Sequence, residues 1–217
     1  MANWTCIPIQ YRVIRALSIT MPPRPDISDK VIHFTRGATA AAALESLLTI
    51  VVEGRLLGGN GMIRGGYNCV CFTEAPLPAL ATGLVNSGSF SRYSPFGLMF
   101  EKAWLHARGG RPVIYQPDAE FTALPEAMRW RHVRYEPSAT PPIDFTWERE
   151  WRIRCQELAF ASAEAAIVVP DDDAEALIRD IWDQQQELEA ESYSTLFEQT
   201  IVELMRDAFP WRVVRLS

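Results

Sequence analysis

The chain has 217 residues, of which 48% are hydrophobic and 22% charged, a composition typical of one globular domain. It contains no apolar run of about 18 residues, and its first residues lack the features of a secretory signal, so we expect neither a membrane span nor secretion. Its four cysteines are too few for a disulfide framework and fit a reducing cytoplasm.

The net charge of −6 is unevenly distributed along the chain. Residues 171–207 contain twelve Asp or Glu against two arginines, a net charge of −10, so the remainder carries +4. The body of the protein therefore tolerates a phosphate-bearing ligand, whereas the acidic C-terminal region repels one.

The first half of the sequence predicts short strands around one clear helix. Residues 1–20 alternate weakly before a proline-rich break, and residues 29–35 are typical of a short buried strand. Apolar residues at helical spacing predict a helix from Ala38 to Glu53, with Gly54 as its C-cap. Five glycines within residues 58–66 predict a loop, and residues 67–73 predict the next strand.

The second half predicts further strands and an acidic helical region. We expect strands at residues 96–100, 111–115, 133–135, 145–155 and 165–169. Pro170 and three following aspartates are typical of a helix start, and helices are expected to about Phe209. A last strand is predicted from Trp211 to Leu216.

These elements indicate the α+β fold class, because strands and helices do not alternate regularly as they do in a doubly wound sheet. We interpret residues 1–170 as an α+β core. Residues 171–217 are then a helical acidic extension with a terminal strand, part of the same domain.

Several common sites lack their motifs. The glycine-rich phosphate loops of dinucleotide-binding and P-loop proteins do not occur. The histidines are widely separated, and Cys69 and Cys71 have no second ligand pair at zinc spacing, so we predict no metal site. There is no nucleophile elbow, and the spacing of Cys69, Cys71 and His33 does not support a nucleophile–base pair.

The main functional signal is the stretch from Trp147 to Arg154, with sequence Trp-Glu-Arg-Glu-Trp-Arg-Ile-Arg. In a strand, Glu148, Glu150 and Arg152 share one face, and Trp151 lies on the other. Two adjacent carboxylates beside bulky apolar groups are costly unless a ligand or partner uses them. The alternative interpretation is an edge strand whose glutamates pair with neighbouring arginines in solvent.

A resemblance to a known fold supports the functional interpretation. Residues 31–37, the following helix and residues 50–56 resemble the opening of ADP-ribosyltransferase-fold proteins, notably the DNA-modifying DarT toxins. Residues 70–77, 93–102 and 110–115 resemble the AbiGi-type abortive-infection family. The Trp-x-x-Glu-Trp-Arg-Ile pattern is similar to one found in related bacterial domains. The resemblance covers roughly residues 30–155 and leaves out the acidic C-terminal helices.

The resemblance implies an ADP-ribosyltransferase-like fold that binds NAD, as substrate, in a cleft between two small antiparallel sheets. Glu150 is then the carboxylate that stabilises an oxocarbenium-like transition state, and Glu148 is a base or orienting group for the nucleophile. His33 and Thr35 hold ribose hydroxyls, and the Phe34 backbone lies near the nicotinamide amide.

The resemblance also implies a pyrophosphate contact from Arg36, Arg55 or Arg64, and a ring stacked on nicotinamide from Tyr67, Phe72 or Tyr93. The sequence does not choose within either set. We predict that His33, Thr35 and Glu150 converge on one cleft. Glu150 faces this cleft, and Trp151 packs into the core behind it.

Two functions follow as hypotheses. The first is a cytoplasmic bacterial ADP-ribosyltransferase or NAD hydrolase of phage-defence or toxin–antitoxin type that modifies a macromolecule, with nucleic acid preferred. Basic and aromatic residues 129–134 fit a nucleic-acid strand or a solvated surface. The second is a non-enzymatic member of the fold that binds a partner protein through acidic helices 171–207, with Glu150 left idle by an ion pair to Arg152. An unrelated small α+β domain is the remaining alternative.

Overall fold

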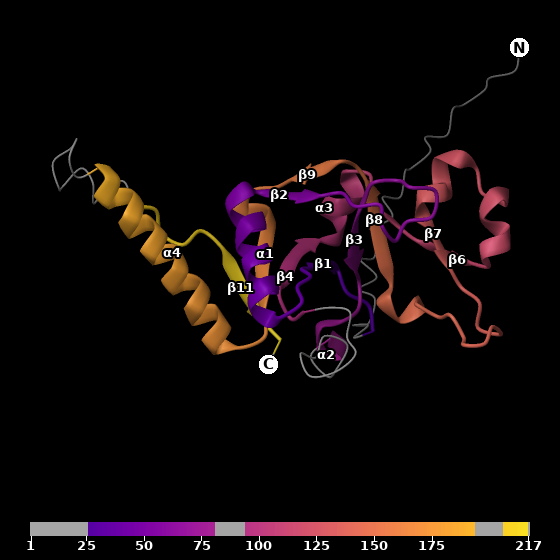
Figure 1. The fold of residues 1–217 in the computed structure, drawn as a ribbon, viewed down its shortest axis with the longest axis horizontal. Helices are drawn as coiled ribbons and strands as arrows, with labels where there is room; N and C mark the ends of the chain where they lie inside the picture. Colours follow the sequence, from indigo (N-terminus) through magenta and orange to yellow (C-terminus); the bar gives the residue numbers. More distant parts are fainter. Residues whose placement is uncertain (1–25, 81–93, 194–205, 217) are drawn as a thin grey trace, which may run out of the picture.

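The computed structural model describes residues 26–80, 94–193 and 206–216, and it confirms the α+β class (Figure 1). Seven strands form the main sheet: β1 (Lys30–Phe34), β3 (Cys69–Thr73), β4 (Gly97–Glu101), β5 (Arg111–Pro112), β8 (Glu150–Arg154), β10 (Ala165–Val169) and β11 (Arg212–Arg215). Two further pairs are β2 (Arg55–Leu57) with β9 (Glu157–Ala159), and β6 (Ile114–Gln116) with β7 (His132–Arg134).

The helices are short except for two. The α-helices are α1 (Ala40–Glu53), α2 (Leu77–Ala79), α3 (Lys102–Ala107) and α4 (Asp172–Tyr193). The 3-10 helices are η2 (Asp118–Ala123), η3 (Glu126–Arg131), η4 (Thr146–Glu148) and η5 (Ser162–Glu164). Residues 114–144, which carry β6, η2, η3 and β7, are called the arm below. The arm lies at one end of the molecule and α4 at the other (Figure 1).

The main sheet is two well-paired groups of strands joined at one point. Its order is β11-β10-β4-β1-β3-β8-β5. β1 pairs with β4 through five residue pairs, and β3 pairs with β8 through five. β1 and β3 share a single pair, Ile32 with Thr73. The sheet therefore divides into β11-β10-β4-β1 and β3-β8-β5, and the division runs beside His33. Pairing is antiparallel except between β10 and β11 and between β6 and β7.

Helix α1 covers one face of the sheet and forms the core with it. Its buried side chains, Leu44, Leu47 and Val51, belong to the same apolar cluster as Leu98 and Ile167 of the sheet. The helix begins at an N-cap, Thr39, whose side chain accepts from the Ala42 amide, and ends at Gly54 in the left-handed region with φ of 63°. The predicted helix and its C-cap are confirmed.

The strand predictions at residues 29–35, 67–73, 96–100, 133–135, 165–169 and 211–216 are also confirmed, within one or two residues. The 145–155 prediction is wrong at its start, because Arg149 has φ of 45° and separates η4 from β8. The 111–115 strand is divided between two sheets at Val113. β2 and β9 were not predicted, and residues 206–211 are not helical.

The acidic C-terminal region begins with α4, which carries eight carboxylates and one arginine. It leaves Leu177 and Leu188 exposed and buries Ile178 against the core. After it, β11 runs parallel to β10 and extends the sheet. Among the residues described, none of the helices has the length and apolar character needed to cross a membrane.

Candidate functional site

Glu150 and Arg152 form a buried ion pair at the start of β8. Their side chains are 10% and 6% exposed. Arg152 Nε donates to Glu150 Oε1 at 2.8 Å, and Nη2 donates to Oε2 at 3.0 Å. This bidentate contact fixes the guanidinium and the carboxylate in one relative orientation. The remaining nitrogen, Nη1, donates to the carbonyls of Trp130 and His132. The pair therefore links β8 to the arm.

The register of β8 agrees with the predicted alternation from Glu150 onwards. Trp151 packs against the core cluster on the opposite face, and its Nε1 donates to Glu74 Oε2 at 2.6 Å. The alternative interpretation, an edge strand with its glutamates paired in solvent, is wrong in two respects. β8 lies between β3 and β5, and the glutamate is paired in the protein interior. The predicted pairing of Glu150 with Arg152 is confirmed.

Glu148 reaches the same region by a different route from the one predicted. It ends the 3-10 helix η4 and is 7% exposed, so it is not on the β8 strand. Its carbonyl accepts from the Thr73 hydroxyl at 2.5 Å, and Thr73 lies opposite Glu150 in the sheet. The left-handed residue Arg149 makes this turn, so both carboxylates stay buried although the strand does not continue.

Cys71 and Tyr115 complete the surroundings of Glu150. Cys71 lies opposite Arg152 in β3, and its thiol lies beside Glu150. Burial, followed by the negative charge of Glu150, raises the pKa of the Cys71 thiol well above its usual range. The Glu150 amide donates to the Tyr115 hydroxyl at 3.1 Å. Burial raises the pKa of Tyr115 to about 12, so the phenol stays neutral at physiological pH.

The charge of Arg152 is stable in this setting. Burial alone would lower the pKa of its guanidinium, but the charge and hydrogen bonds of Glu150 raise it overall. Glu150 therefore faces a permanent positive charge on one side and a neutral thiol and phenol on the others. Its two oxygens each retain a lone pair after binding Arg152.

His33 occupies the division between the two groups of strands. Its Nδ1 lies 2.8 Å from the Cys71 carbonyl, and its ring makes an edge contact with Phe72 at 5.8 Å. Because a carbonyl only accepts, Nδ1 carries the proton. Burial, followed by the charge of Arg36, lowers the His33 pKa, which favours the neutral ring. Neutral His33 then presents Nε2 as an acceptor, which suits a hydroxyl group.

His33 and Glu150 approach Cys71 of the intervening strand from opposite faces of the sheet. The Cys71 carbonyl accepts from His33, whose ring packs against Phe72 on the α1 side, whereas the Cys71 thiol lies beside Glu150 on the other face. The stretches near positions 33 and 150 both lie against β3, but their side chains face opposite sides of the sheet and do not share one cleft as predicted. The remaining predicted residues are divided between this region and the core.

Three predicted binding residues are core residues here. Thr35 is 3% exposed, and its hydroxyl lies 2.9 Å from the Ala43 carbonyl and 3.0 Å from the Phe96 carbonyl. Thr35 therefore has a structural role, because its hydroxyl connects the end of β1 to the start of α1. The Phe34 and Phe72 side chains are buried in apolar clusters on the two faces of the sheet.

The other predicted contacts are dispersed. Arg36 is exposed and close enough to influence the His33 charge. Arg55 pairs with Glu53 and Glu157 beside the β2–β9 sheet, and Arg64 pairs with Asp118 of the arm. The Tyr67 ring lies under Arg154, with 4.8 Å from the guanidinium carbon to the ring centroid. Tyr93 lies outside the described residues.

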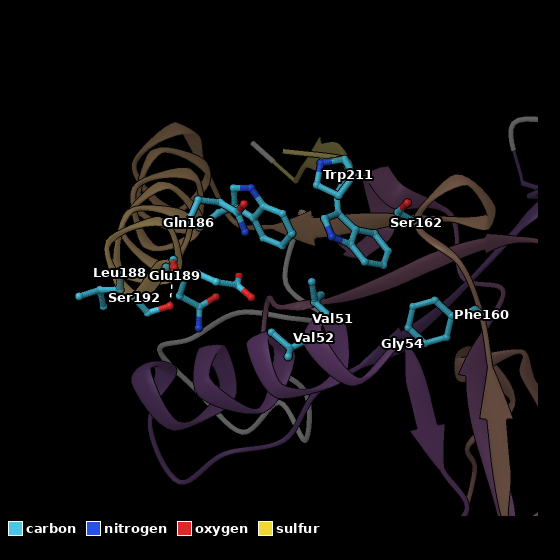
Figure 2. Close-up of a pocket in the computed structure, with 13 residues that line it drawn as sticks. Val51, Val52, Gly54, Phe160, Ser162, Gln186, Leu188, Glu189, Ser192 and Trp211 are labelled. Atoms are coloured by element: carbon cyan, nitrogen blue, oxygen red, sulfur yellow. Dashed lines mark hydrogen bonds between the residues drawn. The ribbon is translucent and has the colours of Figure 1, made fainter. Parts of the chain in front are cut away.

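A cavity of about 720 Å³ lies between α1 and α4 and contains none of the predicted site residues. Figure 2 shows Val51 and Val52 of α1 on one side, Leu188 and Glu189 of α4 on another, and Trp211 above them. It is at the opposite end of the molecule from the arm (Figure 1).

Sequence reasoning missed Cys71 and Tyr115 as neighbours of Glu150. Strand alternation alone could have placed Cys71 beside Arg152 once the β3–β8 register was known. Nothing in the sequence signals Tyr115, which reaches β8 from a different sheet.

Comparisons with known proteins leave the site to be interpreted from its own geometry. No family, no curated protein and no solved structure matches this chain. Within residues 26–80, 94–193 and 206–216, no group of three or more His, Cys, Asp or Glu side chains is arranged to hold a metal ion.

Proposed function

We propose that this protein is an ADP-ribosyltransferase-like enzyme that cleaves NAD and transfers ADP-ribose to a macromolecule, preferably nucleic acid. One observation supports this proposal most strongly. His33 and Glu150 come from segments more than a hundred residues apart, yet both lie against Cys71, on opposite faces of the sheet and beside the line where it divides.

The division of the sheet supports the placement of NAD. β1 and β3 share only the Ile32–Thr73 pair, and beyond it the Cys71 carbonyl is bound by the His33 side chain instead of by the neighbouring strand. The proposed fold implies a cleft between two antiparallel sheets, and this line is the corresponding position. Neutral His33 is available there to accept a hydrogen bond from a ribose hydroxyl through Nε2.

The chemistry follows from the charges around Glu150. The bond between the anomeric carbon and nicotinamide breaks, and its electron pair leaves with the nicotinamide ring, which becomes neutral. Positive charge develops on the ribose, and a nearby carboxylate in a buried site stabilises it. The free lone pairs of Glu150 provide this interaction while Arg152 holds the carboxylate in one orientation.

Glu148 is proposed to complete the reaction. The acceptor nucleophile forms the new bond to the anomeric carbon and gives its proton to the Glu148 carboxylate. With water as the acceptor the same sequence is NAD hydrolysis. The two glutamates are separated by one left-handed residue, which fixes their relative positions.

The test is direct measurement of nicotinamide release from NAD, with and without a single-stranded oligonucleotide. We expect turnover by the unchanged protein and loss of about 100-fold or more in Glu150→Gln. Glu148→Gln should lower transfer more than hydrolysis. Glu157→Gln is the matched control, because Glu157 of β9 is an exposed glutamate that also pairs with an arginine, Arg55 of β2.

Binding is measured in parallel, by calorimetric titration with NAD, so that a missing acceptor does not hide the site. Binding without turnover, weakened in His33→Ala, still supports an NAD site. A protein that neither binds nor cleaves NAD refutes the proposal. Equal turnover in Glu150→Gln and the unchanged protein also refutes the assigned role of Glu150.

The second candidate is a binding protein without enzymatic activity, proposed because Glu150 is neutralised by Arg152 and α4 is strongly acidic. Its partner would be a protein with a basic face, by charge complementarity. The probe is an oligo-arginine peptide. Under this alternative the peptide binds in low salt, the triple change of Asp180, Asp183 and Glu187 to amides abolishes binding, and NAD has no effect.

A further inference from the structure

Eight of the fifteen arginines in the described residues are neutralised by carboxylates, and three of the other seven lie together on the arm and β5. Eight form ion pairs: Arg55, Arg64, Arg108, Arg134, Arg152, Arg179, Arg206 and Arg215. Arg111, Arg129 and Arg131 instead have main-chain carbonyl partners. No described carboxylate lies within ion-pair distance of these three.

Arg111 and Arg131 are held beside each other by the same short segment. Arg111 Nη1 donates to the Gly110 carbonyl at 2.6 Å and the His106 carbonyl at 2.9 Å. Arg131 Nε donates to the carbonyl of Pro112 at 2.9 Å. Burial, followed by the like charge of Arg111, lowers the Arg131 pKa, so the two guanidinium groups repel each other.

Arg129 adds a third charge on the same 3-10 helix. Its Nε donates to the Leu124 carbonyl and its Nη2 to the Thr122 carbonyl, while its guanidinium carbon lies 5.7 Å from the Phe121 ring centroid. Carbonyl partners orient a guanidinium without neutralising it. The three side chains are therefore preorganised and positively charged, and part of the entropy cost of ordering them on binding an anion is already met.

We infer that Arg111, Arg131 and Arg129 form a docking surface for the phosphodiester backbone of a single nucleic-acid strand. Like charges held side by side are unfavourable until an anion lies between them. The guanidinium fork matches phosphate oxygens, and a strand offers phosphates at regular intervals to successive arginines. One small anion can satisfy the Arg111–Arg131 pair but leaves Arg129 unused.

The surface adjoins the proposed catalytic glutamates. Arg111 lies opposite Arg152 in the β5–β8 pairing, and Arg152 donates to the carbonyls on either side of Arg131. A nucleic-acid strand bound to these arginines would therefore run next to β8. The assignment of this strand as the ADP-ribose acceptor rests on the proposed function. The binding itself does not.

Fluorescence anisotropy with a labelled single-stranded oligonucleotide tests the inference, in the absence of NAD. The full chain is compared with an Arg111→Ala/Arg131→Ala double variant. The matched control is Arg55→Ala/Arg179→Ala, which removes the same charge from two arginines that already have carboxylate partners. Circular dichroism establishes that each variant is folded.

Salt dependence gives the expected magnitudes. Each phosphate contact contributes about 0.7 to the slope of log affinity against log salt for a single strand, so three contacts give a slope of about 2. Affinity of the full chain should then fall about 20-fold between 50 and 200 mM salt. The Arg111/Arg131 variant should bind about tenfold more weakly or worse at 50 mM, with a slope reduced by about 1.4. Arg111→Lys/Arg131→Lys should keep most of the slope, because the charges remain.

Several results would overturn the inference. The first is no oligonucleotide binding by the full chain at 50 mM salt, and the second is an equal loss of affinity in the two alanine double variants. The third is displacement of the oligonucleotide by inorganic phosphate beyond that caused by chloride of equal ionic strength, which would mean a small-anion site. Strand binding is measured in the absence of NAD and with Glu150 unchanged, so failure of NAD cleavage and failure of strand binding are separate outcomes.

Discussion

Replacing Arg152 by methionine should destabilise the protein more than any other single arginine replacement in the described part of the chain. Arg152→Met leaves the Glu150 carboxylate buried without its partner and removes the donor to two carbonyls of the arm. Breaking a buried pair from one side costs about 3–5 kcal/mol. Most of this cost is the desolvated carboxylate, since its side chain is only 10% exposed.

The loss should depend on pH with a definite sign. Without Arg152, the cost of the variant is the cost of a buried carboxylate charge that has lost its partner. The loss is therefore expected to be smaller in acid, where protonation removes that charge, and larger at neutral pH. Urea denaturation followed by tryptophan fluorescence at pH 4.5 and pH 7.5 measures this difference. We expect the variant to lose least at pH 4.5.

Two controls make the measurement specific. Arg179→Met removes an exposed arginine that pairs with Glu175 one helical turn away, and it should cost about 0.5 kcal/mol or less. The double variant Glu150→Leu/Arg152→Met should recover most of the loss, since replacing both partners by apolar groups is often neutral. An Arg152→Met variant that is as stable as the Arg179→Met variant at pH 7.5 would refute the reasoning.

Three further predictions concern the fold around the site. Gly54→Ala should cost about 1 kcal/mol by urea denaturation, because Gly54 has φ of 63°, whereas Gly59→Ala, with open space at its Cβ position, should be neutral. Burial lowers the His33 pKa below 6.5, so stability is lost as pH falls below about 6.5. His33→Asn, whose side-chain amide can still donate to Cys71, should flatten the stability profile between pH 7 and 5. Burial raises the pKa of Cys69 from 9.0 to about 11, so native alkylation by iodoacetamide at pH 8, followed by mass spectrometry, should run about 100-fold slower than in urea. Equal native and denatured rates would contradict that pKa.

Local sequence patterns were sufficient for the parts of the fold that depend on one element. The α1 helix follows from its apolar spacing and its terminal glycine, and the strands that face the core follow from β-branched and aromatic runs. The alternation from Glu150 to Arg154 also held, so Trp151 faces the core and Glu150 the opposite side.

The errors occur where a distant partner decides the backbone. Pro112 has no amide hydrogen, and the chain changes sheets after it, pairing first with β8 and then with β7. Arg149 takes a left-handed conformation that its residue type does not favour, so no local signal marks the start of β8. β2 and β9 are three residues each and exist only as partners of one another. The site inherits this difficulty, since its residues are assembled by pairing among β1, β3 and β8.

The Glu150–Arg152 pair allows the two proposed functions to be separated by one comparison. A carboxylate that only completes a buried ion pair contributes to stability, and Glu150→Gln then lowers unfolding free energy without changing any reaction. A carboxylate that also stabilises positive charge on a ribose contributes to turnover through the lone pairs that Arg152 leaves free. Under the enzymatic proposal, Glu150→Gln therefore abolishes nicotinamide release at temperatures where the variant is fully folded. Nicotinamide release that declines only as the variant unfolds would assign the pair to stability alone, and would favour the binding protein.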